Sequence, residues 1–466
     1  YLNSLYELSS SGKFLHKHSP FGRDIYSMSQ NNVKSKSIAC GGAHTLALGE
    51  GGFSIFASGG GRNGQLGIGI HGERRCPVLV SGLEGLSDVT MVAAGECYSA
   101  AVTSCGSLVL WGGNIYGQLG LGDHTDRMLP VSFDLSYFGG VLVKMVACGT
   151  THTILAMDNG GLFGFGTNSY GELGLGHRRL VMYKPVKIPS GISPKDGILD
   201  IAAGYSHSGV VTSSGRVWTW GAGCHGQLGH GTDGDELVPR EIRKVETQYR
   251  AQSLAAGGNH TMVVTTDGMV WGFGSGNCGQ LGVGDTTDKK SPVFVGGVET
   301  FGMWGVNVIS CGSLHTLAVT EQGAVWSWGR GHGGRLGQLT VQTSLFPVQL
   351  NREYFGNEFI VSISAGCGHS LAVSKHGSLF SWGRDTSFGV PCGLCHAEHG
   401  NKFTPQKVAP ALLQGMRIGR GLLLREDKLL AVLMGIHPSL SQNSVLGVLS
   451  GKIELVDLII EMCRDV

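Results

Sequence analysis

Short runs of apolar and β-branched residues, separated by glycine-rich turns, make up most of the 466-residue chain. Four such runs follow one another between residues 252 and 295: QSLAAG, HTMVVTT, MVWGFG and SPVFV. The Asp-Gly step after the second run is a strong hairpin signal. The third run carries large residues at alternate positions, Trp271 and Phe273, which therefore face the same side of a sheet. The pattern predicts a unit of four short β-strands.

This unit recurs with a period of about 54 residues, and three independent markers show it. Gly-Gln-Leu-Gly or a close match begins at residues 64, 117, 171, 226, 279 and 334. A Gly-x-x-His motif places one histidine in each of six units, with Tyr98 in the same position of the second: His44, His152, His207, His260, His315 and His369. A proline comes just before or within each fourth run. The markers define seven units between roughly Ser37 and Val408.

Seven four-stranded units, each too small to hold a core alone, predict an all-β fold, a seven-bladed β-propeller over residues 36–410. A helical solenoid needs a 3.6-residue periodicity, which the repeats lack, and a parallel β-helix needs a shorter period. Ring closure removes the open sheet edges of a linear array. We predict that the strand ending each repeat can pair with the next blade. In that arrangement Thr404–Val408 would lie beside Ser37–Cys40 and clasp the ring.

Composition and charge exclude several classes of function. The formal net charge of +1 gives no electrostatic case for nucleic-acid binding, and no apolar run reaches the length of a membrane span. Glycine is abundant, with 78 residues, or about one in six, against roughly 7% in average proteins. The 12 cysteines are scattered, which favours a reducing intracellular compartment. Because the chain begins with Tyr1 rather than Met, organelle import stays open.

The glycine-rich stretch WGAGCHGQLGHGTDG, residues 220–234, taken alone is typical of a phosphate-binding loop or a linker. It recurs in the other units, however, and no Lys-Ser/Thr pair follows its glycines. We therefore interpret it as a turn segment that recurs in each repeat, and we expect no cofactor. The repeated histidines are spaced around a ring and cannot converge on one metal ion. We interpret them as buried structural residues, each hydrogen-bonded to a neighbouring backbone group.

The motifs AGxxHT, GxVWxWG, GQLGxG and PxxV together resemble the regulator of chromosome condensation family over about residues 37–408. The resemblance implies a seven-bladed propeller but leaves function open. Members include a nucleotide exchange factor for the Ran GTPase, ubiquitin-ligase modules, a plant ultraviolet-B photoreceptor and scaffold proteins. The exchange factor is expected to need a wedge-like insertion in one blade, which the regular repeat lengths here do not contain. The photoreceptor needs exposed tryptophans, whereas most here occupy blade-interior positions, with Trp304 the exception.

The last unit departs from the pattern and contains the sequence CGLCHAEH. Cys392, Cys395 and His399 are weak candidates for a zinc site, because Cys-x-x-Cys is a zinc-type spacing. The Cys-x-x-Cys-His order also fits covalent haem attachment. No second Cys-x-x-Cys supports either interpretation, and an irregular surface loop is the simpler alternative.

These observations favour a non-enzymatic protein-interaction scaffold in a larger assembly, with a guanine-nucleotide exchange factor for a small GTPase as the alternative. No catalytic constellation is visible. We expect protein partners to contact rim loops and the C-terminal segment 411–466, whose apolar spacing predicts amphipathic helices; residues 1–35 are expected to be an irregular lead-in. Paired basic residues after three glycine loops are the predicted partner contacts: Arg74, Arg75, Arg178, Arg179, Lys289 and Lys290. They are expected to line one face and to meet an acidic or polar protein surface.

Overall fold

A computed structural model describes residues 6–8, 14–16, 37–52, 54–193, 195–243, 250–387, 390–391 and 393–408. The chain divides into two compact units, residues 1–35 and 36–466. In the first unit β1 (Tyr6–Leu8) and β2 (Phe14–His16) pair antiparallel, a hairpin within the segment predicted to be irregular. The predicted C-terminal helices, residues 411–466, lie outside the described residues.

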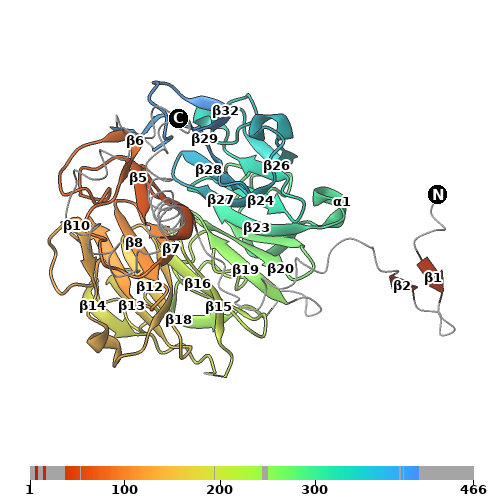
Figure 1. The fold of residues 1–466 in the computed structure, drawn as a ribbon. Helices are drawn as coiled ribbons and strands as arrows, with labels where there is room; N and C mark the ends of the chain where they lie inside the picture. The colour runs from red at the N-terminus through yellow and green to blue at the C-terminus, as the bar shows by residue number, and fades with distance from the viewer. Residues whose placement is uncertain are drawn as a thin grey trace, which may run out of the picture. The chain divides into compact units, whose positions relative to one another are not determined.

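The second unit contains seven four-stranded antiparallel sheets, arranged as the blades of a β-propeller (Figure 1). Blade one consists of β3 (Ile38–Cys40), β4 (His44–Leu48), β5 (Ile55–Gly59) and β6 (Arg74–Leu79). Blade two consists of β7 (Val89–Ala94), β8 (Tyr98–Thr103), β9 (Leu108–Gly112) and β10 (Arg127–Ser132). Blade three consists of β11 (Val143–Cys148), β12 (His152–Met157), β13 (Leu162–Thr167) and β14 (Val181–Lys187). Blade four consists of β15 (Ile198–Ala203), β16 (His207–Thr212), β17 (Val217–Gly221) and β18 (Glu236–Glu241). Blade five consists of β19 (Ala251–Ala256), β20 (His260–Thr265), β21 (Val270–Gly274) and β22 (Lys289–Gly296).

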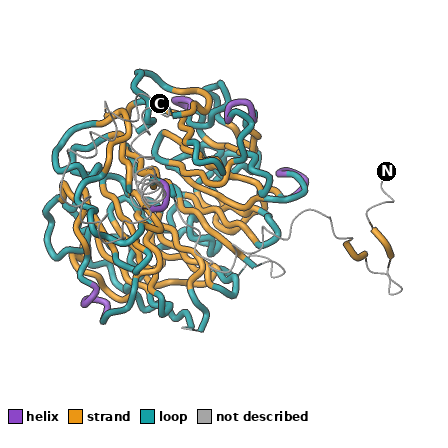
Figure 2. The backbone as a smooth tube through the Cα atoms, viewed as in Figure 1, coloured by secondary structure: helices purple, strands orange, loops and turns teal. Residues whose placement is uncertain are grey.

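Blade six consists of β23 (Val306–Cys311), β24 (His315–Thr320), β25 (Val325–Gly329) and β26 (Ser344–Gln349). Blade seven consists of β27 (Ile360–Ala365), β28 (His369–Ser374), β29 (Leu379–Gly383) and β32 (Lys402–Lys407). A small ladder of β30 (Thr386–Ser387) and β31 (Val390–Pro391) lies in the last unit. The short helices are η2 (Glu50–Gly52), η3 (Leu135–Phe138), α1 (Val298–Phe301), η4 (His332–Gly334) and η5 (Arg352–Phe355). Strands dominate the described fold, as Figure 2 shows. The predicted seven blades of four strands are confirmed.

Each blade takes all four of its strands from its own repeat, so the predicted clasp between the ends of the ring is wrong. The last strand, β32, pairs with β29 of its own sheet, and β3 pairs with β4. The first strands of successive blades pack against one another, and β27 of blade seven packs against β3 of blade one in the same way. Closure therefore depends on side chains and loops packed between two complete sheets rather than on strand exchange.

The fourth strand of each blade lies at the edge of its sheet and accommodates the repeated proline. In blade five Gly274 pairs with Lys289 and Gly272 pairs with Val293, with a shift of register between them. Pro292 lies in the shifted stretch, where its missing N–H costs no ladder hydrogen bond. This irregularity explains why a proline marker recurs at this position of the repeat.

The core lies between neighbouring blades and is filled by the alternating residues of the third strands. Trp111, Trp220, Trp328 and Trp382 are fully buried, and Phe165 and Phe273 occupy the equivalent position in two other blades. Short helices between blades add further rings: Phe301 of α1 packs edge-on against Trp326, and Phe355 of η5 packs against Phe380. Trp304 is 52% exposed, as expected for the one exception to the blade-interior pattern.

Candidate protein-interaction face

The two faces of the ring carry different connections because the strands of each blade alternate in direction. One face carries the turn between the first and second strands and the glycine-rich loop between the third and fourth; we call it the glycine-loop face. The opposite face carries the tight turns between the second and third strands and the connections to the next blade. Arg178 and Arg179 lie in the loop between a third and a fourth strand. The other two pairs are the first residues of the fourth strands β6 and β22, at the strand ends nearest that loop, so all three pairs lie on the glycine-loop face.

The repeated histidines link each blade to its neighbour on this face. The Nε2 atom of His44 lies 2.9 Å from the Oγ atom of Ser99 in the next blade, and His207 lies 3.0 Å from Thr261 in the same manner. Equivalent contacts join His152 to Ser208, His260 to Thr316, His315 to Ser370 and His369 to Thr45. The predicted burial of the histidines is confirmed. Each Nε2 atom lies beside a side-chain hydroxyl, and for His207 a backbone hydrogen bond to His260 of the next blade opposes the lowering of its pKa by burial, as expected.

For five of the six hydroxyls the direction of the hydrogen bond follows from a second contact, a donation to a loop carbonyl oxygen. Ser99 Oγ donates to the carbonyl oxygen of Gln65, 2.8 Å away, so it accepts from the Nε2–H group of His44. Burial lowers the pKa of His44 to about 3 and that of His207 to about 4, so both rings are neutral at neutral pH. Tyr98 replaces the histidine in blade two and donates from its hydroxyl to the carbonyl oxygen of His152, 2.6 Å away.

The Gly-Gln-Leu-Gly loop of a blade also forms hydrogen bonds with the next blade. The carbonyl oxygen of Gln280 accepts from Thr316 Oγ1 at 2.8 Å and from the indole Nε1 of Trp328 at 3.0 Å, both in the next blade. The side chain of Gln280 accepts from the backbone N–H of Cys278, which fixes the loop that presents the carbonyl. Each glycine loop therefore has a structural role in this joint, and the loop tips beyond it are free to vary.

Four of the six predicted basic residues form ion pairs within the ring. Arg75 in blade one pairs with Asp385 in blade seven at 2.7 Å, and Arg178 pairs with Asp235 in the following blade at 2.9 Å. Lys289 pairs with Asp285 and Lys290 with Asp233, each at 2.7 Å. For Arg74 and Arg179 the described residues show no ion pair, although Arg74 donates to the carbonyl oxygen of Glu73. Most of the charge expected for a partner is thus already balanced by neighbouring carboxylates.

Exposed apolar side chains lie on the same face, which the search for charged pairs missed. Ile115 is 64% exposed, Leu180 is 68% exposed and Leu339 is 66% exposed, and all three lie in loops between third and fourth strands. Tyr116 and Tyr183 are also exposed in blades two and three. Exposed aromatic and aliphatic side chains of this kind are frequent at the centre of protein interfaces. A comparison of loop tips between repeats, rather than a search for charge, would have found them.

Two family models match most of the chain between them. A model described as an RCC1-like domain matches residues 9–263, and the regulator of chromosome condensation (RCC1) repeat matches residues 267–319 and 322–373. The chain belongs to the regulator of chromosome condensation family. It is similar to the ultraviolet-B receptor UVR8 of Arabidopsis thaliana, with 38% identity over 65% of the chain and 66% of the receptor.

Two further similarities bear on fold and function. The secretion-regulating guanine nucleotide exchange factor of Mus musculus is 31% identical over 63% of each chain. The chain thus spans just under two thirds of the length of this relative and of the receptor. The crystal structure of human WBSCR16 superimposes with a TM-score of 0.67 at 23% identity, covering 76% of this chain and 94% of that structure, which supports the fold alone.

The Cys392–His399 region of this family member does not assemble a metal site among the described residues. Cys392 lies outside them. Burial raises the pKa of the Cys395 thiol to about 12, and its Sγ atom lies 3.0 Å from Ser58 Oγ in blade one. His399 is exposed and lies 4.0 Å from Asp385. Cys395 thus fills the joint between the last and first blades, and the zinc site suggested by its Cys-x-x-Cys spacing stays a prediction.

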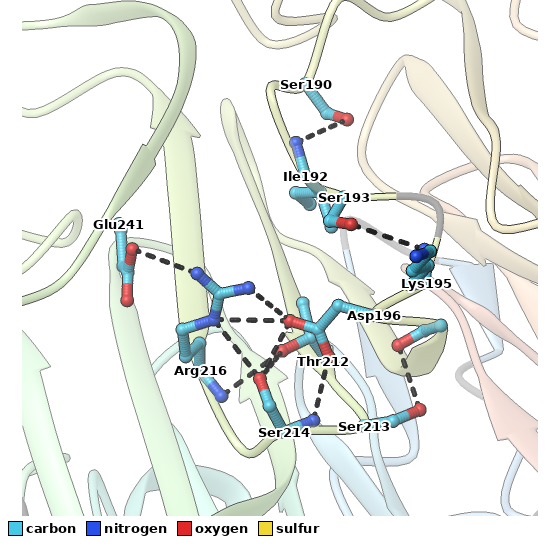
Figure 3. Close-up of polar contacts among 11 residues, drawn as sticks. Ser190, Ile192, Ser193, Lys195, Asp196, Thr212, Ser213, Ser214, Arg216 and Glu241 are labelled. Atoms are coloured by element: carbon cyan, nitrogen blue, oxygen red, sulfur yellow. Dashed lines mark hydrogen bonds and ion pairs between the residues drawn. The ribbon is translucent and has the colours of Figure 1, made fainter.

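The opposite face carries a polar cluster around Asp196, shown in Figure 3. The Asp196 carboxylate accepts from the backbone N–H and the hydroxyl of Ser214 and pairs with Arg216 at 2.5 Å. Burial alone would raise the pKa of Asp196, but these hydrogen bonds from Ser214 and Arg216 lower it to about 2. Arg216 also lies 3.7 Å from Glu241. The cluster is internally satisfied, so it holds the blade-three connection to blade four and offers no free group to a ligand.

Within the described ranges no helix is long and apolar enough to cross a membrane. All ten cysteines described there are free of disulfide bonds.

Proposed function

We propose that this propeller is a non-enzymatic protein-interaction scaffold that presents its glycine-loop face to the acidic or polar surface of a protein partner, within a larger assembly. The observation that supports it most is the contrast between invariant joints and variable loop tips. The histidine and carbonyl joints recur in blade after blade, whereas the exposed tips carry Ile115, Tyr116 and Leu180 beside basic side chains. Surfaces of this composition supply the anchors of protein interfaces. The free cysteines support a reducing compartment as the site of action.

The test is affinity capture of partners from cells of the source organism, followed by a salt series. Arg75 should be kept, since its ion pair with Asp385 joins the first and last blades. The variant replaces the other five predicted basic residues by Ser: Arg74, Arg178, Arg179, Lys289 and Lys290. Because charge-steered contacts weaken with ionic strength, we expect lower retention at every salt concentration and a shallower salt dependence.

A matched control replaces Lys195 and Arg243, two exposed basic residues in connections on the opposite face, by Ser and should retain partners as the unaltered protein does. Unchanged retention and salt dependence in the five-residue variant, with loss in the control, would contradict the proposed face.

Guanine-nucleotide exchange on a small GTPase is the second candidate, favoured by the similarity to the secretion-regulating exchange factor. The regular repeats give no insertion that would act as a wedge. The measurement is release of a fluorescent GDP analogue from a panel of small GTPases at catalytic concentrations of the protein. The scaffold proposal expects no acceleration; release that is accelerated at least tenfold would favour the exchange activity instead.

A further inference from the structure

We propose that Arg330, Arg335 and Arg384 form an anion-binding site on the glycine-loop face, at the boundary between blades six and seven. The site would take neighbouring carboxylates of an acidic, partly apolar peptide segment in a protein partner. This inference rests on the proposed function and names a different part of the same face from the six basic residues that the sequence predicted.

The three arginines break the repeat at positions where every other blade has a small or uncharged polar residue, or an acid. Arg330 and Arg384 directly follow the third-strand glycine, where the other blades have Gly60, Gly113, Thr167, Ala222 and Ser275. Arg335 stands in the Gly-Gln-Leu-Gly loop, where the other blades have Gln65, Gln118, Glu172, Gln227 and Gln280. Two adjacent blades thus concentrate three positive charges at positions that the fold itself does not require to be charged.

The side chains of Arg335 and Arg384 lie side by side over one glycine. A Cβ atom placed on Gly368 would lie 3.5 Å from Cδ of Arg384 and 3.8 Å from Nη2 of Arg335. Arg384 also covers Gly333, where a Cβ atom would lie 3.1 Å from its own Cβ. At the position of Gly333 other blades carry large side chains, such as Tyr116 and Tyr170. The loop of blade six therefore lacks a side chain where Arg384 lies.

The charges of the two outer arginines are not balanced within the ring. Among the described residues the side chains of Arg330 and Arg384 form no ion pair or hydrogen bond, in contrast to Arg75 and Arg178. Arg335 is 5% exposed, and donates to the carbonyl oxygens of His332 and Cys367. These carbonyl groups hold the guanidinium in place beside Arg384.

All three arginines act electrostatically on one neighbouring side chain, His332. Burial lowers the pKa of His332, and the charges of Arg330, Arg335 and Arg384 lower it further. The acid next to Arg384 in the chain, Asp385, is engaged elsewhere. Its carboxylate pairs with Arg75 and accepts from the backbone N–H of Gly400.

The flank of the site points to a peptide rather than a free anion. The same loop of blade six carries Leu339, 66% exposed, and Val341, 56% exposed. Leu339 is held by its backbone N–H, which donates to the carbonyl oxygen of Phe403 in blade seven. Guanidinium groups bind carboxylates through paired, charge-assisted hydrogen bonds. A segment with neighbouring acidic residues and an adjacent apolar side chain would match both parts.

The test is fluorescence anisotropy with a fluorescein-labelled octaglutamate peptide, against an octaglutamine peptide of the same length, at low ionic strength. We expect the whole chain to bind octaglutamate and not octaglutamine. Arg384→Ser and Arg330→Ser should each weaken binding about tenfold, as expected for loss of one charge-assisted contact. Arg335→Gln restores the residue of four other blades, so it should keep the melting temperature while weakening octaglutamate binding to a similar extent.

The matched control is the double variant Lys289→Ser with Lys290→Ser, which removes two basic side chains of the same face in blade five. It should bind octaglutamate within twofold of the unaltered protein. Equal binding of octaglutamine, or equal loss in the control, would overturn the site. Displacement of the peptide by inorganic phosphate far beyond that by chloride of matched ionic strength would also overturn it, because the site would then select phosphoryl groups. Salt-dependent partner capture without octaglutamate binding would contradict this inference and leave the proposed function standing.

Discussion

The Nε2 atom of His369, in the last blade, lies 3.1 Å from the Oγ1 atom of Thr45, in the first blade. The two residues are 324 positions apart in the chain, yet their contact repeats the one that joins every other histidine to the following blade. The first and last blades are therefore joined by the same kind of contact, between a histidine Nε2 atom and a hydroxyl group, as the other blades that carry the histidine. Propeller closure in this protein requires no shared strand, and the stability of the ring depends on seven similar joints.

Replacing Thr45 by Val should destabilise the closing joint, since the buried His369 ring would lose its hydrogen-bond partner in the first blade. We expect the free energy of unfolding to fall by about 1–3 kcal/mol, as for a buried polar group left without a partner. Equilibrium urea unfolding measures this. Thr286→Val, at an exposed loop position, is the control and should change stability little. Equal effects of the two substitutions would show that the joint contributes nothing.

Acid should destabilise the propeller through its buried histidines. The pKa of His152 is lowered to about 3 and that of His369 to about 4, both chiefly by burial, whereas unfolded histidines titrate near 6.5. Well above pH 6.5 both states are neutral and stability is at its full value. As pH falls below 6.5 the unfolded state takes up protons that the folded state refuses, so stability is lost progressively down to about pH 4.

With six such histidines the loss should be several times the value of about 1.36 kcal/mol per pH unit that one proton contributes. Urea unfolding at a series of pH values between 7 and 5 gives this slope. His207→Tyr, which copies the residue of blade two, should fold and lower the slope by about one proton. A slope that the substitution leaves unchanged would mean that His207 is already charged in the folded state.

Sequence alone determined the blade number, the strand positions and the burial of the histidines, because each depends on residues within one repeat. The joints could not be predicted in the same way. The hydroxyl that accepts the hydrogen bond from His44 belongs to Ser99 in the next blade, and this hydrogen bond depends on how two sheets pack. The basic residues show the same limit, since Arg178 finds its carboxylate in Asp235, one blade away. Whether a surface charge is free is a property of neighbouring blades, and the repeat pattern does not contain it.

Trp328 tests the joint made by the glycine loop. Its indole N–H donates to the carbonyl oxygen of Gln280, whereas Phe165 and Phe273 occupy the same position elsewhere without that hydrogen bond. Trp328→Phe should therefore fold and lose only about 1 kcal/mol, while Trp328→Ala should lose roughly 3–5 kcal/mol through the cavity it leaves. Thermal and urea unfolding compare the three proteins. A loss with Phe as large as that with Ala would mean that the hydrogen bond, rather than packing, dominates this joint.

Glycine at the turn before each histidine should be irreplaceable for steric reasons. A Cβ atom on Gly257 would lie 2.3 Å from Cε1 of His260 and 2.5 Å from the carbonyl oxygen of Gly312 in the next blade. Because one of these atoms belongs to backbone, Gly257→Ala must separate two blades, and we expect a loss of about 3 kcal/mol or more. Gly234, with no atom within 4 Å of the same position, is the matched control. Gly234→Ala should leave the melting temperature unchanged or raise it slightly, since it restricts the unfolded chain. Equal melting temperatures for the two alanine variants would show that the blades can separate at this turn without cost.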